Sequence, residues 1–289
     1  MNPNIVERIN ELKNDKLHGA NWLSVQAKKI LHLAIQESKA ITITEFINEL
    51  QRTATVITEA RQNMISIANY TTRLLNRIIV DSQGQRQLAS VKNIAQGKVN
   101  EFIKLIQETP LKAAENAAKI ITDQDTIITC SYSSTVCNTF KVARGRTINF
   151  KVIIAESTHN NLAYGRISAE QLKQYQITVT VIPDKAIYRY VAKADKTFVG
   201  TDTILTDGSL INGIPTYQLA QAASTAKIPF YAVCETAKFD VRNQYLNKPA
   251  LEPGFDLIPA SLITGIITEA GIIESVDVAK YILKGDTIA

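Results

Sequence analysis

The 289-residue sequence contains few metal-binding or disulfide-forming residues and no long apolar run. Its three cysteines, Cys130, Cys137 and Cys234, are an odd number without the paired spacing of a zinc site, which indicates a reducing, cytoplasmic setting. The three histidines lie far apart, so we expect no metal site, and no motif indicates a cofactor. No window reaches about eighteen apolar residues, and the first residues lack the apolar core of a signal peptide, so neither membrane spanning nor export is expected.

The basic residues form no continuous stripe, although the formal net charge is +5. Lysines and arginines are scattered along the chain, so nucleic acid is not an expected partner. A chain of this length exceeds what one core usually serves, which predicts two structural units.

Residues 1–119 are predicted to form a helical N-terminal domain, because apolar positions recur at intervals of three and four. Gly19 separates the first two helices, Thr44 is a plausible N-cap, and Trp22 is expected in the core. We expect helices over 90–109 and 110–119, with Pro110 in the first turn of the second.

Residues 120–289 alternate short β-rich runs with helical segments, which predicts right-handed crossovers and a parallel sheet. The expected fold class is α/β, with an N-terminal helical bundle followed by a doubly wound, Rossmann-like parallel sheet domain. Residues 253–258 are expected to reach a last strand or edge, and Pro259 to open a terminal helix. The strands are expected at 125–129, 149–155, 178–182, 196–199 and 229–233, and the helices at 133–144, 168–174, 186–192 and 216–227.

Asp202 follows an apolar strand and a glycine, which places its carboxylate beyond the carboxyl edge of the sheet. Thr201, Asn212 and Thr216 lie nearby in sequence, and together these groups favour a pocket for a polyol or sugar phosphate over an ordinary loop. Ser133 stands at a strand-to-helix turn, where the helix start either receives a phosphate or is simply capped by the serine.

The same stretches resemble the family of the α, β and δ regulatory subunits of eukaryotic initiation factor 2B. That family includes two sugar-phosphate isomerases, which act on ribose-1,5-bisphosphate and methylthioribose-1-phosphate. The resemblance is collinear over roughly residues 120–275, and its specificity comes from the combination of motifs. The matching stretches are 129–136, 155–157, 165–166, 181–184, 200–202, 207–208, 211–212, 216–220, 235–239, 255–259 and 264–273.

The resemblance implies that a cysteine and the aspartate matched by Asp202 move protons in the isomerases. Here Ser131 aligns with that cysteine, and Cys130 stands one residue earlier. Neighbouring residues that leave a strand point to opposite sides, and a hydroxyl is a far weaker acid than a thiol, so efficient catalysis is not expected. Cys130 is interpreted as a buried apolar residue in preference to a catalytic acid.

Cationic positions of the isomerase pattern have also changed. His18, Gly19 and Ala20 match an Arg-Gly-Ala phosphate loop with histidine in place of arginine, and Gly213 replaces a lysine. Arg166 and Lys238 match family positions and are interpreted either as ligand anchors or as solvated, ion-paired groups. A doubly phosphorylated sugar is therefore expected to bind poorly.

Two functions remain open. The first is a regulatory, oligomeric protein of the initiation factor 2B type that binds a phosphorylated sugar or a nucleoside monophosphate without turning it over. A translation factor is a possible partner of such a protein. The second is an aldose-ketose isomerase with Asp202 as base and Cys130 or Ser131 as acid. An apolar run, Ile263 to Ile273, is interpreted as an exposed stripe that favours a homodimer or higher homo-oligomer.

Overall fold

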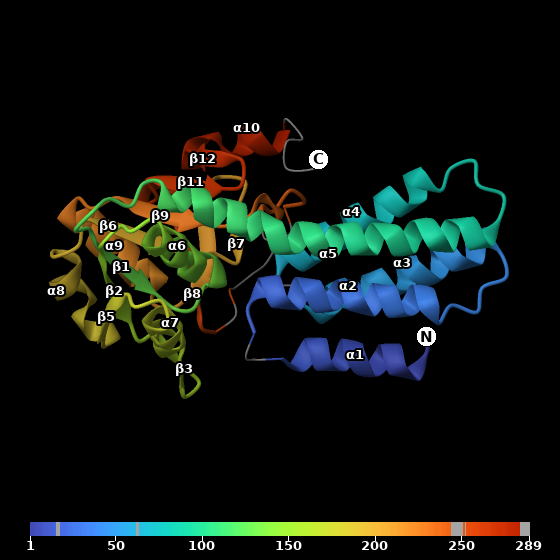
Figure 1. Cartoon of the computed structure of the whole chain (residues 1–289), viewed down its shortest axis with the longest axis horizontal. Coiled ribbons are helices and arrows are strands. Elements are labelled where there is room, and N and C mark those ends of the chain that lie inside the picture. The colour runs from blue at the N-terminus through green and yellow to red at the C-terminus, as the bar shows by residue number, and fades with distance from the viewer. Residues whose placement is uncertain (16–17, 62–63, 244–250, 252, 284–289) are drawn as a thin grey trace. The chain divides into compact units, whose positions relative to one another are not determined.

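The computed structural model describes residues 1–15, 18–61, 64–243, 251 and 253–283. The chain divides into two compact units, Met1–Glu108 and Thr109–Ala289 (Figure 1). The division falls within one long helix, whereas the sequence pattern placed the change of structure at residues 119 and 120, just past that helix. No helix of the described residues is long and apolar enough to cross a membrane.

The first unit is helical. Its helices are α1 (Pro3–Asn14), α2 (Ala20–Gln36), α3 (Ile43–Ala60), α4 (Ile65–Asp81) and the beginning of α5 (Leu88–Ala118). Their apolar faces share one core, with Leu23, Phe46 and Leu74 fully buried. Gly19 is the N-cap of α2, as the sequence indicates.

Three details of this unit differ from the sequence-based expectation. Thr42, not Thr44, caps α3, because its hydroxyl and the Glu45 side chain form a reciprocal capping box. Trp22 is 43% exposed, since its ring stacks on His18 outside the core. The two helices expected at 90–119 are a single α5, which continues through Pro110 although an interior proline removes a backbone hydrogen bond and crowds the preceding turn.

The second unit is built on a seven-stranded sheet in the order β12-β11-β9-β6-β1-β2-β5. Six of the strands run parallel, and β12 pairs antiparallel with β11 at one edge. The expected α/β class is confirmed, and so are the five expected strands. The strands are β1 (Thr126–Cys130), β2 (Lys151–Ala155), β5 (Thr178–Ile182), β6 (Lys196–Val199), β9 (Phe230–Val233), β11 (Gly265–Thr268) and β12 (Gly271–Ile273).

Helices cover both faces of this sheet (Figure 1). Alternate residues of β1 show the pattern, because Ile128 belongs to the core on one face and Ile127 to the core on the other. The first core includes α8 (Ile187–Val191), α9 (Thr216–Ala226) and α10 (Val278–Leu283). The second includes the end of α5, α6 (Ser134–Gly145) and α7 (Tyr164–Lys173).

A smaller antiparallel sheet lies beside the carboxyl edge. It has the order β10-β8-β7, formed by β10 (Phe255–Ile258), β8 (Leu210–Gly213) and β7 (Thr203–Ile204). The strand expected at 253–258 therefore exists, but it belongs to this sheet. A two-stranded hairpin, β3 (Thr158–His159) and β4 (Leu162–Ala163), follows β2.

The expectation that Pro259 opens a terminal helix is wrong. The segment contains a short 3-10 turn, Ala260–Leu262, and then continues into β11 and β12 of the main sheet. Ile263, Ile266, Ile267 and Ile273 are buried within this chain, and Ile272 is the exposed member at 54%. The isoleucine run is therefore sheet core, because β-branched side chains pack well on a pleated surface, and it provides no exposed stripe for a dimer.

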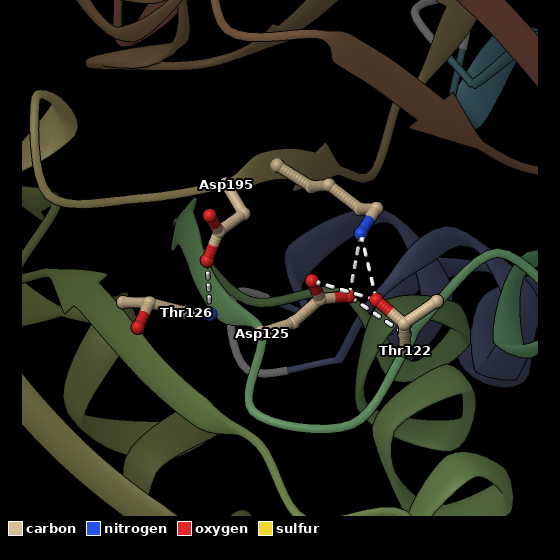
Figure 2. Close-up of polar contacts among 5 residues, drawn as sticks. Thr122, Asp125, Thr126 and Asp195 are labelled. Carbon is tan, nitrogen blue, oxygen red and sulfur yellow. Dashed lines mark hydrogen bonds and ion pairs between the residues drawn. The ribbon is translucent and has the colours of Figure 1, made fainter.

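A polar network fixes the amino ends of β1 and β6 (Figure 2). The Lys196 ammonium donates to Asp125 over 2.6 Å, and Asp125 accepts from the backbone and hydroxyl of Thr122 over 2.7 and 2.9 Å. The Thr126 backbone N–H donates to Asp195 over 2.8 Å. These contacts satisfy polar groups at the amino edge of the sheet, so the two central strands are held in register from that end.

Candidate functional site

The chemistry-bearing residues of the second unit gather where the parallel strands end. Strand β6 lies between β1 and β9, and all three run in the same direction. Cys130 closes β1, Asp202 follows β6, and Lys238 follows β9. Because the carboxyl ends of parallel strands meet at one edge, the topology brings these three residues to a common edge of the sheet.

Ser131 is held in a left-handed backbone conformation, with φ of 61°. Its backbone N–H donates to the Ser157 hydroxyl over 2.6 Å, and its carbonyl accepts from the Ser168 hydroxyl over 2.9 Å. Ser157 is itself left-handed, with φ of 53°, and its N–H donates to Asp184 over 2.7 Å. Such conformations are costly for residues other than glycine, so hydrogen bonds on both sides of the loop over-determine the position of Ser131.

The thiol of Cys130 is buried and tied to Thr216. The Thr216 hydroxyl donates to the carbonyl of Gly213 over 2.6 Å and accepts from the Asn212 amide over 3.0 Å. Its one proton is therefore used, so in the 3.3 Å contact between Cys130 Sγ and Thr216 Oγ1 the thiol is the donor. Burial raises the pKa of Cys130 to about 12. The thiol is thus a protonated group at neutral pH.

Asp202 and Lys238 lie within electrostatic reach of a buried carboxylate, that of Glu235. Lys238 is 7% exposed and its ammonium donates to the Thr201 carbonyl over 2.6 Å. Burial raises the pKa of the half-buried Asp202, Lys238 opposes this rise, and Glu235 adds to it. The Asp202 carboxylate therefore lies in a low-dielectric environment with a cation beside it, which suits a group that binds polar ligand atoms or exchanges a proton.

Ser133 caps α6, because its hydroxyl accepts from the backbone N–H of Val136 over 3.3 Å. Of the two roles that the sequence leaves open, capping is the one present in the structure, and phosphate binding at this helix start stays a prediction. Gly200 faces this serine: a Cβ at Gly200 would lie 2.6 Å from both Cβ and Oγ of Ser133. The loops after β1 and β6 are therefore in direct contact.

Gly200→Ala is expected to lower the free energy of unfolding by about 1 to 3 kcal/mol, since the added methyl overlaps Ser133 and displaces the cap of α6. Ser133→Gly removes the atoms that clash. The double variant should therefore recover most of the loss in a denaturation experiment on all four proteins of the cycle. Additive losses in the double variant would contradict the contact.

The remaining predicted residues lie elsewhere or have other partners. Arg166 forms an exposed ion pair with Glu156. His18, Gly19 and Ala20 belong to the first unit, where His18 pairs with Asp15 and stacks on Trp22 at 3.8 Å between ring centroids. Their predicted ligand role, like that of Arg166, stays a prediction.

Sequence reasoning missed several residues that shape this edge. Glu235, Ser157 and Asp184 lie in stretches that carry the family resemblance, but no local pattern assigned them a role. Ser168 has no signal in the sequence, because its hydroxyl reaches Ser131 only through the packing of α7 beside β1 and β2. Among the described residues, no group of three or more potential ligands is arranged to hold a metal ion.

Comparisons with known proteins agree with this architecture. A model of the Initiation factor 2 subunit family matches residues 16–248. A Pyrococcus furiosus protein named as translation initiation factor eIF-2B subunit 2-like is 31% identical, with 93% of this chain and 96% of the relative covered. Ribose 1,5-bisphosphate isomerase of Methanocaldococcus jannaschii is 28% identical, with 93% and 91% covered.

A solved structure, the translation initiation factor eIF-2B of Pyrococcus horikoshii, aligns with a TM-score of 0.78 and 26% identity. The alignment covers 95% of this chain and 98% of that one. The family match spans both units, and its relatives include proteins named for translation initiation and proteins named for sugar-phosphate isomerisation. The chain therefore belongs to the Initiation factor 2 subunit family.

Proposed function

We propose that this protein is a regulatory binding protein of the initiation factor 2B type, which holds a phosphorylated sugar or a nucleoside monophosphate without efficient turnover. The observation that carries the proposal is the state of the Cys130 thiol. It is 2% exposed, it donates to Thr216, and burial raises its pKa to about 12. A proton shuttle needs two accessible groups with pKa values near the operating pH. The Cys130 thiol is not accessible, and its pKa lies far above neutral pH.

Ser131 does not supply the missing acid. Its backbone is fixed by Ser157 and Ser168, but a serine hydroxyl is a poor proton donor without an activating partner. The Ser131 hydroxyl lies close to Gly213, since a Cβ at Gly213 would be 3.3 Å from Ser131 Oγ. A hydroxyl in this position suits hydrogen bonding to a ligand.

The ligand proposal rests on Lys238 and on the groups around it. A buried ammonium beside Asp202 supports recognition of an anionic group together with hydroxyls. Gly213 offers no side-chain charge where the family resemblance implies a lysine. A ligand with one phosphate is therefore favoured over a bisphosphate.

A thermal-shift screen tests the binding function. We expect AMP or ribose 5-phosphate to raise the Tm by several degrees, because a ligand at about 100 times its Kd stabilises by about 2.7 kcal/mol. Adenosine and ribose at the same concentrations are the matched controls without phosphate and should shift the Tm less. No shift with any phosphorylated compound would contradict the proposal.

The second candidate function, sugar-phosphate isomerisation, is supported by Asp202. The raised pKa of Asp202 moves this carboxylate toward the range in which a general base works near neutral pH. If the protein is an isomerase, Asp202→Asn will abolish interconversion of ribose 1,5-bisphosphate or methylthioribose 1-phosphate with the ribulose form. Binding in the thermal-shift screen should survive that substitution.

Homo-oligomerisation and a translation-factor partner remain parts of the proposal. Their support is the naming of relatives as eIF-2B subunits, which describes components of larger assemblies. Sedimentation of the purified chain tests the first of these, and a monomer at all concentrations would contradict it.

A further inference from the structure

Glu235 is a buried carboxylate without a hydrogen-bond partner among the described residues. Its side chain is 1% exposed, and neither carboxylate oxygen accepts a hydrogen bond there. An ionised carboxylate can accept about four hydrogen bonds, and a buried one that makes none is costly. Such a group persists in a fold when it balances a neighbouring charge or serves a site.

The neighbouring charge is Lys238. Glu235 is the N-cap of the 3-10 turn Thr236–Lys238, and the Lys238 backbone N–H donates to the Glu235 carbonyl over 3.0 Å. Glu235 and Lys238 therefore stand at the two ends of one short turn, and both residues are buried.

We propose that Glu235 is the positioning residue of the candidate site, whose buried carboxylate keeps the Lys238 ammonium charged beside the end of β6. The ammonium is held in place by the Thr201 carbonyl at 2.6 Å, and Asp202 is the next residue. Glu235 contributes the full counter-charge that a carbonyl dipole lacks. It acts through Lys238 and is not itself expected to contact the reacting or binding atoms.

The electrostatics of Lys238 agree with this arrangement. Burial on its own would lower the pKa of Lys238, but Glu235 first, then Asp202 and Cys234, raise it above the ordinary value. Glu269 faces Glu235 and Thr236, and Arg242 faces Asp240. Glu235 is thus the largest of the three influences that favour the charged amine.

The consequence for the site is a permanent positive charge. With Glu235 in place, Lys238 stays an ammonium throughout the physiological pH range, so the affinity for an anionic ligand group should not depend on its titration. This consequence rests on the proposed function, whereas the state of Lys238 can be tested without any ligand.

The test compares Glu235→Gln with the wild-type chain by measuring the Tm between pH 7 and pH 10. Glu269→Gln is the matched control, because Glu269 is a neighbouring part-buried carboxylate that interacts with Glu235 and not with Lys238. In the wild type, the raised pKa of Lys238 gives stability that is fully present below the unfolded value and is lost only above the folded one. Its contribution is therefore constant in this window.

In Glu235→Gln, we expect burial to outweigh the remaining influence of Asp202 and Cys234, so that the pKa of Lys238 falls below its unfolded value. The loss of folding stability caused by the buried Lys238 is then largest at pH 7. It shrinks as the pH rises, because Lys238 of the unfolded chain also loses its proton. We expect the Tm deficit of Glu235→Gln to fall by at least half between pH 7 and pH 10, and that of Glu269→Gln to stay constant. A pH-independent deficit of Glu235→Gln, or none, would overturn the proposal.

A double variant keeps the proposal falsifiable if Glu235→Gln does not fold. Glu235→Gln with Lys238→Met removes the buried amine together with its counter-charge. It should be more stable at pH 7 than Glu235→Gln, and a double variant that is equally unfolded would overturn the proposal.

Ribose 5-phosphate separates this inference from the proposed function. If the wild type binds it, Glu235→Gln should lose at least tenfold in affinity between pH 7 and pH 9.5 relative to the wild type. If the wild type does not bind it while the Tm deficit depends on pH as expected, the proposed ligand fails and the role of Glu235 stands. If Glu235→Gln binds ribose 5-phosphate with the same pH dependence as the wild type, the proposed role of Glu235 is overturned.

Discussion

Gly165→Ala is expected to destabilise the second unit by about 3 kcal/mol or more, because the added methyl group overlaps the backbone of a neighbouring strand. A Cβ at Gly165 would lie 1.9 Å from the Ala155 carbonyl oxygen and 2.9 Å from its carbonyl carbon. Both are backbone atoms of β2, which is paired with β1 on one side and β5 on the other. The strand has no freedom to yield, so α7 must shift.

Calorimetry measures this loss as a fall in Tm of roughly 6 to 12 °C for a unit of this size. Gly145→Ala is the control, because nothing lies within 4 Å of a Cβ at that helical position. Alanine there should change the stability by less than about 1 kcal/mol. A Gly165→Ala protein as stable as the Gly145→Ala protein would show that α7 does not approach β2 as described.

Lys28→Met is expected to stabilise the first unit at and below pH 7. Lys28 is fully buried between α2 and α4, where its ammonium donates to the Thr71 hydroxyl. Burial lowers the pKa of Lys28 from 10.5 to about 7. One pKa unit corresponds to about 1.4 kcal/mol, so protonation of this amine costs the folded unit roughly 3 to 5 kcal/mol below pH 7. The lost hydrogen bond to Thr71 offsets about 1 to 3 kcal/mol of the gain.

The pH dependence of this effect has a definite sign. The folded pKa lies below the unfolded one, so the cost is fully present below pH 7 and disappears as the pH rises toward 10.5. Trp22 is the one tryptophan in the sequence and lies in the first unit, so its fluorescence reports unfolding there. The gain in Tm of Lys28→Met should be largest at pH 6 and small at pH 10, and a gain that does not vary with pH would contradict a neutral buried amine.

The fold of the second unit was largely predictable from local pattern. Each β-rich run such as 178–182 is short, apolar and bounded by turn residues, and the alternation with helices leaves a parallel sheet as the main solution. The pattern failed at Ile263 to Ile273. Two strands joined by a tight turn at Glu269 and Ala270, after which Gly271 has a φ of 119°, present the same dense isoleucines as an apolar helix, and periodicity alone does not separate the two structures.

The candidate site was predictable only in part. Cys130 and Asp202 could be predicted as candidate site residues, because each stands at or just after the end of a buried strand and this position is visible in the local sequence. The role of Thr216 in fixing the thiol proton depends on three partners from two strands, Cys130 of β1 and Asn212 and Gly213 of β8. Trp22 was placed in the core because tryptophan is usually buried, whereas its stacking on His18 at the surface depends on one side-chain contact.

The most direct measurement of the central claim is NMR of ribose 1,5-bisphosphate incubated with a stoichiometric amount of the protein. The buried, proton-donating thiol of Cys130 predicts that no ribulose 1,5-bisphosphate forms over hours while AMP or ribose 5-phosphate still raises the Tm. Formation of the ribulose product by the wild type, with its loss in Asp202→Asn, would contradict a binding protein and establish an isomerase.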